Sequence, residues 1–197
     1  MNLPNKLTIL RIILTAAFMV FLFSGGVAAK VAALIVFLLA SLTDILDGYI
    51  AKRNNQVTDF GKLMDPIADK ILVLSAFLAF VELGLVPAWM VAIILFREVA
   101  VTALRGMALA KGKVISAGEG GKQKTVWQMC VIFIILLFVI FDEGSRSRFG
   151  FWTERVAVIY KDAIFALMCV TIALTLTSGI SYFVKNKEVY ANETKGR

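Results

Sequence analysis

The sequence predicts an all-α protein, a polytopic membrane bundle of six transmembrane helices. Of the 197 residues, 59% are apolar and 18% are charged, and the mean hydropathy is +0.83. Soluble domains have about 45–50% apolar and about 25% charged residues. The apolar residues fall into six runs close to the length of roughly 20 residues that a helix needs to cross a bilayer. We therefore expect a single integral membrane domain that occupies residues 1–197.

Glycine, proline and charged residues separate the six runs. The pair Gly25-Gly26 divides the first two, and the segment from Gly84 to Pro87 divides the third from the fourth. Such residues interrupt helices because they favour turns or need water. The expected spans are Leu7–Ser24, Val27–Ile50, Phe60–Val81, Pro87–Ala110, Lys124–Phe141 and Arg155–Val184.

The basic residues predict how the spans are oriented. With both termini inside, thirteen of the 21 Lys and Arg residues fall in inner segments, and four (Lys30, Arg146, Arg148 and Arg155) fall in outer ones. Positively charged short loops stay in the cytoplasm. We therefore expect a multi-pass protein of the cell membrane, and the net charge of +7 faces anionic lipid rather than nucleic acid.

The missing residue types exclude several kinds of chemistry. The chain has no histidine, which removes Ser-His-Asp and Cys-His nucleophile systems and His-ligated metal sites. Its two cysteines, Cys130 and Cys169, are too few for a four-thiolate zinc site. Any reaction must therefore use carboxylates, amines, guanidiniums and bound metal ions.

Carboxylates gather where the second and third spans meet. Asp44, Asp47, Gly48 and Ala51 share one face of the second span, because they are spaced i, i+3, i+4 and i+7. Gly61, Asp65 and Asp69 are spaced four residues apart and share a face of the third span. A short loop joins the spans, so we expect antiparallel neighbours whose four carboxylates converge at the cytoplasmic end.

Four oxygen ligands without His or Cys suit a hard cation such as Mg²⁺ or Mn²⁺, and two such ions suit phosphoryl chemistry. Ionisable residues inside a span are functional candidates because they are costly there. The small residues on these faces leave room for a ligand. The alternative is that the acids form salt bridges with Lys52, Arg53, Lys62 and Lys70, and that the glycines only allow close helix packing.

These residues carry a family resemblance. The pattern Asp44-x2-Asp47-Gly48-x2-Ala51-Lys52-x8-Gly61-x3-Asp65-x3-Asp69 resembles the signature of the CDP-alcohol phosphatidyltransferases. The segments Asn2–Thr8 and Asp65–Lys70 and the chain length resemble the bacterial phosphatidylglycerophosphate synthases in particular. The family usually has Arg where this chain has Lys52, and lysine keeps the charge but lacks the bidentate fork.

The resemblance implies a role for each matched position. Asp44, Asp47 and Asp65 would ligate two divalent cations that hold the diphosphate of a CDP-lipid, and Asp69 would be the general base and a further metal ligand. The residues implied for the nucleotide pocket are Asn5, Thr8, Gly48, Ala51, Lys52 and Gly61. For Asn5 and Thr8 a helix-capping role stays open as the alternative.

Basic residues near the same level predict a phosphate-bearing acceptor. Arg97 and Arg105 lie in the fourth span, and Lys124 starts the fifth. Arginine suits phosphate by its geometry, so we expect these three residues to bind the acceptor phosphate. For Arg97 the alternative is a pair with Glu98, and for Lys124 an ordinary positive residue at the inner surface.

The expected activity is the transfer of the phosphatidyl group from CDP-diacylglycerol to sn-glycerol 3-phosphate, with release of CMP. Two alternatives remain: the same chemistry with inositol phosphate, serine or phosphatidylglycerol as acceptor, and a cation transporter whose intramembrane acids bind its ion. The resemblance also implies contact with membrane lipids and a homodimer.

Overall fold

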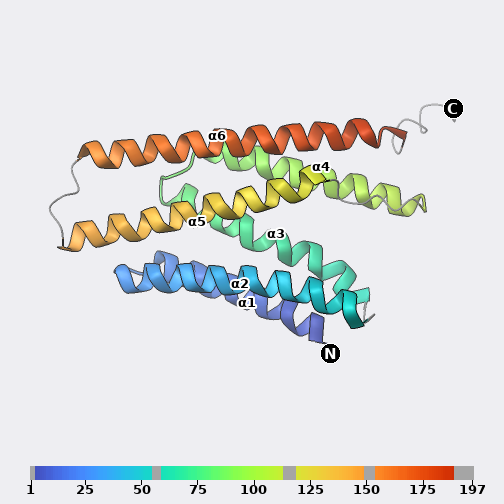
Figure 1. Ribbon diagram of the computed structural model, residues 1–197, viewed down its shortest axis with the longest axis horizontal. Helices are drawn as coiled ribbons and strands as arrows, with labels where there is room; N and C mark the ends of the chain where they lie inside the picture. The colour runs from blue at the N-terminus through green and yellow to red at the C-terminus, as the bar shows by residue number, and fades with distance from the viewer. Residues whose placement is uncertain (1–2, 55–58, 113–118, 149–153, 189–197) are drawn as a thin grey trace.

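Six helices in alternating directions make up the described part of the protein (Figure 1). The computed structural model describes residues 3–54, 59–112, 119–148 and 154–188, and the side chains of residues 7–43, 70–112, 121, 123–145 and 156–188. The helices are α1 (Leu3–Phe23), α2 (Val27–Asn54), α3 (Asp59–Glu82), α4 (Ala88–Ala110), α5 (Glu119–Arg148) and α6 (Glu154–Lys185). The expectation of an all-α fold is confirmed for the described residues. The last turns of α2 and α4 and the first turns of α1, α3 and α5 lie toward the same end of the bundle (Figure 1).

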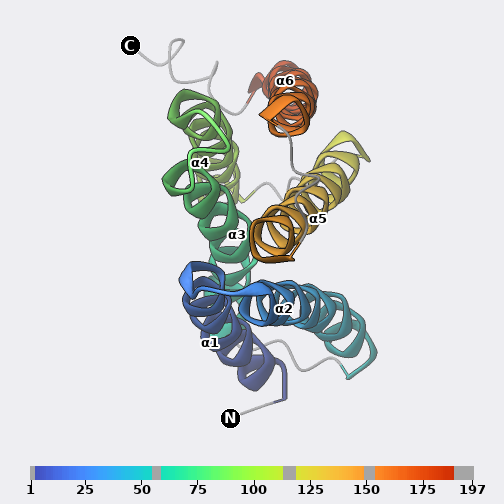
Figure 2. The same cartoon turned by 90° about the vertical axis from the view of Figure 1, so that its left-hand side faces the viewer.

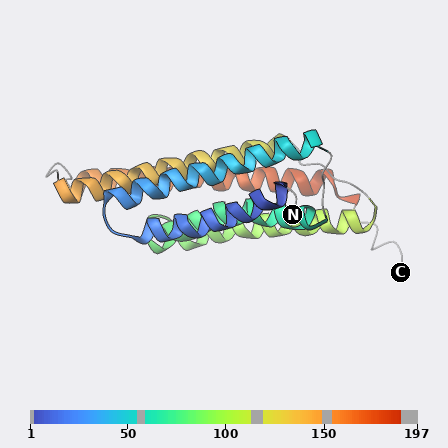
Figure 3. The ribbon, with the colours of Figure 1, turned by 90° about the horizontal axis from the view of Figure 1, so that it is seen from below.

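The helices form a long bundle (Figures 2 and 3), in which α1 packs against both α2 and α3. Both α2 and α3 pack mainly against α1 and touch each other only slightly. Helix α5 packs against α2, α3 and α6, and α4 packs against α3 and α6. Among the described residues, α4 and α5 do not pack directly against each other, so side chains alone join them.

Aromatic rings and small residues fill the core. The ring centroids of Phe18 on α1 and Phe37 on α2 lie 5.7 Å apart, and both side chains are buried. Buried Ala33 and Ala40 on α2 and Ala76 on α3 allow the backbones to approach, as small residues do between membrane helices. Packing of this kind stabilises helices that have lipid around them.

The outer surface is apolar. Large side chains such as Phe96, Leu109 and Ile159 are 77%, 67% and 66% exposed, which in a water-soluble monomer would be an unusually apolar surface. Two described segments, Gln123–Ser145 and Val156–Lys185, are long and apolar enough to cross a membrane. Leu7–Phe23 and Val27–Thr43 are apolar but shorter. Each of the six expected spans thus corresponds to a helix of the structure. Within the described residues, α5 and α6 contain segments that are long and apolar enough to cross a membrane.

Polar side chains close the turn between α1 and α2. Gly26 has a positive φ of +90°, which glycine adopts without a steric penalty, and its N–H donates to Glu143 Oε1 of α5 at 2.7 Å. The ammonium group of buried Lys30 donates to the carbonyl of Leu22 at 2.5 Å. Each of these bonds satisfies a backbone group that a helix end leaves without a partner.

The boundaries that the sequence predicts agree with the structure at the turns around Gly26 and Gly84, and they differ from it at both ends of α5. This helix begins at Glu119 and ends at Arg148, whereas the sequence predicts a span from Lys124 to Phe141 and a connection from Asp142 onward. The polar residues continue the helix beyond the apolar run, because an α-helix satisfies its own backbone hydrogen bonds on either side of the bilayer surface.

Candidate functional site

The predicted metal ligands occupy positions at one end of the bundle. Asp44 and Asp47 belong to the second half of α2, and Asp65 and Asp69 to the first half of α3. Because the two helices meet there (Figure 1), the backbone brings the four positions to the same end of the molecule. Their side chains lie outside the described residues, as do those of Asn5, Gly48, Ala51, Lys52 and Gly61. Metal and nucleotide binding by these residues therefore stay predictions.

A polar stripe on α1 points into the bundle near these positions. Thr8, Arg11 and Thr15 are buried, with at most 4% of each residue exposed. Thr15 Oγ1 donates to the carbonyl of Arg11 at 2.8 Å. Thr8 lies in the second turn of α1, which begins at Leu3, so the capping hypothesis for Thr8 is wrong, since a capping side chain precedes the first helical residue. Its nucleotide-binding role stays a prediction.

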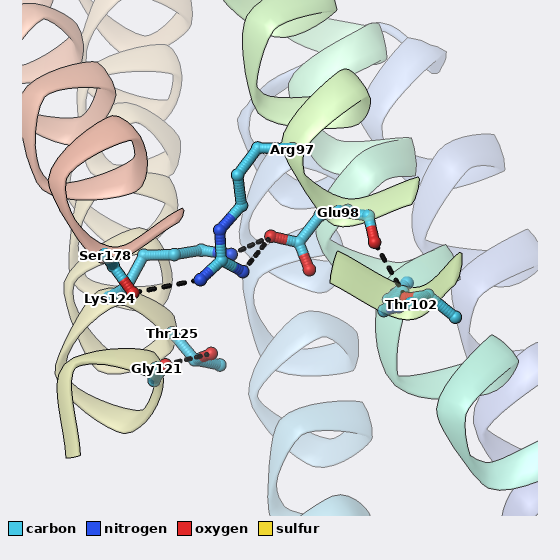
Figure 4. A network of polar contacts seen from close by, with 8 residues as sticks. Arg97, Glu98, Thr102, Gly121, Lys124, Thr125 and Ser178 are labelled. Carbon is cyan, nitrogen blue, oxygen red and sulfur yellow. Dashed lines mark hydrogen bonds and ion pairs between the residues drawn. The ribbon is translucent and has the colours of Figure 1, made fainter. Parts of the chain in front are cut away.

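Two of the three predicted acceptor residues meet at one carboxylate, as Figure 4 shows. Arg97 Nη1 lies 3.1 Å from Glu98 Oε1, and the same oxygen pairs with the ammonium group of Lys124. The side chains of Arg97, Glu98 and Lys124 are 10%, 16% and 3% exposed. The pairing with Glu98 that the sequence left open for Arg97 is therefore present. The half-buried carboxylate of Glu98 thus lies between two buried cations.

Helix α6 completes the surroundings of Arg97. Arg97 Nη2 donates to Ser178 Oγ at 2.9 Å. A Cβ atom on the neighbouring Gly179 would lie 3.0 Å from Arg97 Cγ, which is closer than side chains normally approach. The pair Ser178-Gly179 thus gives the guanidinium a path between α4 and α6 and a hydrogen-bond acceptor at its end.

A second set of contacts ties α3 to the same part of α4. The hydroxyl of Thr102 donates to the backbone carbonyl of Glu98 at 2.7 Å and accepts a hydrogen bond from the ammonium group of Lys70. Lys70 follows the predicted general base, Asp69, in the sequence. The Glu98 region is therefore connected to α3, the helix that carries two of the four predicted metal ligands.

Arg105 lies apart from the other two predicted acceptor residues. It stands eight residues after Arg97 on α4, about 12 Å along the helix axis, and its side chain is exposed. Its Nε donates to the hydroxyl of Tyr182 on α6 at 3.2 Å, and its guanidinium lies 5.6 Å from the centroid of that ring. The structure therefore brings Arg97 and Lys124 together and places Arg105 nearer the end of the bundle.

A pocket lies between α3, α4 and α5, where α4 and α5 are bridged by side chains. It has an empty volume of about 350 Å³, including the part open to the outside. The lining residues are Lys70, Val73, Leu74, Ile94, Glu98, Thr125 and Gln128. The described side chains thus form a cavity with charged groups at one level and apolar groups at the next. Such a cavity can hold a small polar molecule whose carbon atoms contact the apolar groups.

Sequence reasoning missed several residues of this region. Glu98 was considered only as a partner of Arg97, and Gln128, Ser178, Gly179 and Tyr182 were not considered at all. A glutamine inside an apolar run and a Ser-Gly pair in the last span are the signals that could have found them, because polar and small residues within spans mark helix interfaces and cavities.

We predict that Glu98→Gln destabilises the protein, because it leaves the buried cations Arg97 and Lys124 without their shared anion. Breaking a buried ion pair costs about 3–5 kcal/mol. Thermal unfolding of the purified protein in detergent measures the effect. The control is Glu82→Gln, at an exposed position on α3, which should leave the midpoint unchanged. Adding Lys124→Gln to Glu98→Gln should restore part of the loss, and equal midpoints for Glu98→Gln and the control would contradict the account.

Comparison with known proteins shows the family of the chain. The family model described as CDP-alcohol phosphatidyltransferase matches residues 1–177. A CDP-diacylglycerol–glycerol-3-phosphate 3-phosphatidyltransferase of Bacillus subtilis is 39% identical, over 95% of this chain and 96% of its own. A probable phosphatidylglycerophosphate synthase of Mycobacterium tuberculosis is 37% identical, over 93% and 81%. A CDP-diacylglycerol–glycerol-3-phosphate 3-phosphatidyltransferase of Rickettsia felis is 36% identical, over 96% and 97%. The chain therefore belongs to the CDP-alcohol phosphatidyltransferase family.

Proposed function

We propose that this protein transfers the phosphatidyl group of CDP-diacylglycerol to sn-glycerol 3-phosphate, which gives phosphatidylglycerol phosphate and CMP. The observation that carries the proposal is the fixed spacing from Asp44 to Asp69, on two helices that meet at one end of the bundle. The names of the relatives support glycerol 3-phosphate as the acceptor over inositol phosphate, serine or phosphatidylglycerol. Membership of a transferase family argues against the cation transporter.

The donor half of the site is assigned to α1, α2 and α3. Asp44, Asp47 and Asp65, with Asp69 as a further ligand, would hold two Mg²⁺ or Mn²⁺ ions, which suits a donor set of carboxylate oxygens. When bound, these ions neutralise the charge of the diphosphate and of the departing CMP. The residues assigned to the nucleotide are Asn5, Thr8, Gly48, Ala51, Lys52 and Gly61. The burial of Thr8 on α1, the helix against which both α2 and α3 pack, supports this assignment.

The chemical step is a substitution at phosphorus. A hydroxyl oxygen of the acceptor forms a bond to the phosphorus of the phosphatidyl group, and the bond between that phosphorus and the oxygen of CMP breaks. The carboxylate of Asp69 takes the proton of the attacking hydroxyl. General bases of this kind contribute about 10²–10⁴ to a rate.

The acceptor phosphate is assigned to Arg105, Arg97 and Lys124. A dianionic acceptor that approaches a diphosphate needs cationic partners of its own. Arg105 is an exposed residue and can meet an anion that enters the site, whereas Arg97 and Lys124 share Glu98. All three lie on helices whose ends reach the same side of the bundle (Figure 1).

The proposed setting is the cell membrane. The six helices would each cross it, with both termini and the segments Lys52–Asp59 and Lys111–Gly121 in the cytoplasm and the segment Asp142–Thr153 outside. The active site would then face the cytoplasm and its water-soluble acceptor. The apolar outer surface supports contact with lipid acyl chains. The proposed assembly is a homodimer, as the family resemblance implies.

The four aspartates are tested by amide replacement. Asp44→Asn, Asp47→Asn, Asp65→Asn and Asp69→Asn should each abolish most CMP release while the protein still inserts and folds, because an amide keeps the size but removes the charge that holds a cation. For Asp69→Asn, retained Mn²⁺ binding would assign it to proton transfer rather than ligation. The control is Asp162→Asn at an exposed position of α6. Near-normal turnover in any of the four variants would remove that residue from the site.

Arg105→Ala should raise the KM for glycerol 3-phosphate about ten- to hundredfold, because a charge-assisted hydrogen bond to phosphate is worth about 1.5–3 kcal/mol. Steady-state kinetics with each substrate varied in turn measures the effect. The KM for CDP-diacylglycerol should change far less. Lys187→Ala, which removes another exposed cation, is the control. If the KM values of both substrates rise equally, Arg105 supports the scaffold and does not bind the acceptor.

The orientation is tested by cysteine labelling of intact cells with a membrane-impermeant reagent. The background variant replaces Cys130 and Cys169, which are free and exposed, with alanine. A cysteine at Ser147 should be labelled, and one at Asn55 should be protected until the cells are opened, because positive loops stay inside. The reverse pattern would place the proposed site on the wrong side of the membrane for its substrates.

A further inference from the structure

Gln128 of α5 carries a buried amide nitrogen that has no hydrogen-bond partner among the described residues. The residue is 3% exposed, and within the part of the chain that the structure describes its Nε2 atom makes no hydrogen bond. A buried amide without a partner is costly, and more so where lipid replaces water around the protein. A side chain of this kind in a cavity wall indicates a ligand that supplies the missing bond.

The cavity that Gln128 lines has two levels. Lys70, Glu98 and Thr125 form a polar level, and Val73, Leu74 and Ile94 stand about one helical turn further from the predicted cytoplasmic end. Gln128 belongs to the second level, because it follows the buried Lys124 by four residues on the same face of α5. The deeper level is therefore apolar with one amide, and it fits a short carbon chain that bears a hydroxyl group.

The register of α3 connects this cavity to the proposed reaction. Position 69, assigned to the general base, precedes the lining residue Val73 by four residues and therefore lies on the same face of α3. Lys124, assigned to the acceptor phosphate, lies one turn from Gln128. A molecule in the cavity thus lies near both the position of the base and Lys124, which pairs with the lining residue Glu98.

We propose that Gln128 determines acceptor specificity by binding the secondary hydroxyl of glycerol 3-phosphate, with Val73, Leu74 and Ile94 against its carbon atoms. This inference rests on the proposed function. The terminal hydroxyl is then the one that attacks phosphorus and gives its proton to Asp69, and the secondary hydroxyl is held away from the reaction. An amide offers both donors and an acceptor, so it pairs with a hydroxyl in either direction.

The test compares two acceptors that differ by this one group. Glycerol 3-phosphate has the secondary hydroxyl, and 3-hydroxypropyl phosphate lacks it but keeps the terminal hydroxyl and the phosphate. We expect the wild type to prefer glycerol 3-phosphate in kcat/KM by about tenfold or more, since a site built to bind a hydroxyl rejects the analogue without it. Gln128→Leu should lower kcat/KM about tenfold for glycerol 3-phosphate and leave it unchanged for the analogue.

Two further variants complete the design. Gln128→Met, which keeps the side-chain volume, should behave like Gln128→Leu and serves if the leucine variant does not fold. Gln123→Leu, at an exposed position of the same helix, is the matched control and should keep the wild-type preference. The KM for CDP-diacylglycerol should stay the same in all variants.

The outcomes separate the inference from the proposed function. Equal losses for both acceptors in the Gln128 variants would show a packing role and overturn the inference, as would a wild type that uses both acceptors equally well. In either case CMP release with glycerol 3-phosphate would leave the proposed function standing. A wild type that releases no CMP with glycerol 3-phosphate would overturn both.

Discussion

The pairing of the Glu98 carboxylate with two cations is the interaction on which the polar contacts between α3, α4, α5 and α6 depend. It pairs with Arg97 on its own helix and with Lys124 on α5, although α4 and α5 do not pack directly against each other among the described residues. In a low-dielectric interior two cations stay close only if an anion lies between them. Because long side chains make this bridge, the helices stay far enough apart to leave a cavity between them.

The remaining polar contacts follow from that bridge. Arg97 donates a hydrogen bond to Ser178 on α6, and its side chain passes so close to Gly179 that a Cβ there would lie 3.0 Å from Arg97 Cγ. The backbone carbonyl of Glu98 accepts the hydroxyl of Thr102, which in turn receives Lys70 from α3. Four helices are thereby connected beside the positions of the predicted metal ligands. A membrane protein has little water with which to satisfy such groups, so polar residues gather where the helices can serve as partners for one another.

Much of the fold could be predicted from the sequence, because apolar run length and glycine turns are local properties. The turns at Gly26 and Gly84, both with positive φ, lie where the sequence places them. The family could also be predicted, since the pattern from Asp44 to Asp69 has a fixed spacing along two adjacent helices and needs no knowledge of how distant helices pack. The ends of α5 could not be predicted from the sequence, because this helix continues beyond its apolar residues at both ends.

Partners that depend on packing between distant helices could not be predicted. Lys124 pairs with Glu98 across 26 residues of sequence, and Arg105 meets Tyr182 across 77. Charge alone suggested that Arg97, Arg105 and Lys124 form one phosphate site, and the structure divides them, because a glutamate neutralises part of the charge and an aromatic ring holds the third residue elsewhere. Gln128 could not be identified from the sequence, because its position in the cavity wall depends on how α3, α4 and α5 pack and not on its neighbours in the sequence.

The most direct measurement of the central claim is CMP release by the purified protein in detergent, with CDP-diacylglycerol, Mg²⁺ or Mn²⁺ and a panel of acceptors. The account predicts release with sn-glycerol 3-phosphate, none after the metal is removed by a chelator, and far less with inositol phosphate, serine or phosphatidylglycerol. Release with one of these other acceptors and none with glycerol 3-phosphate would contradict it.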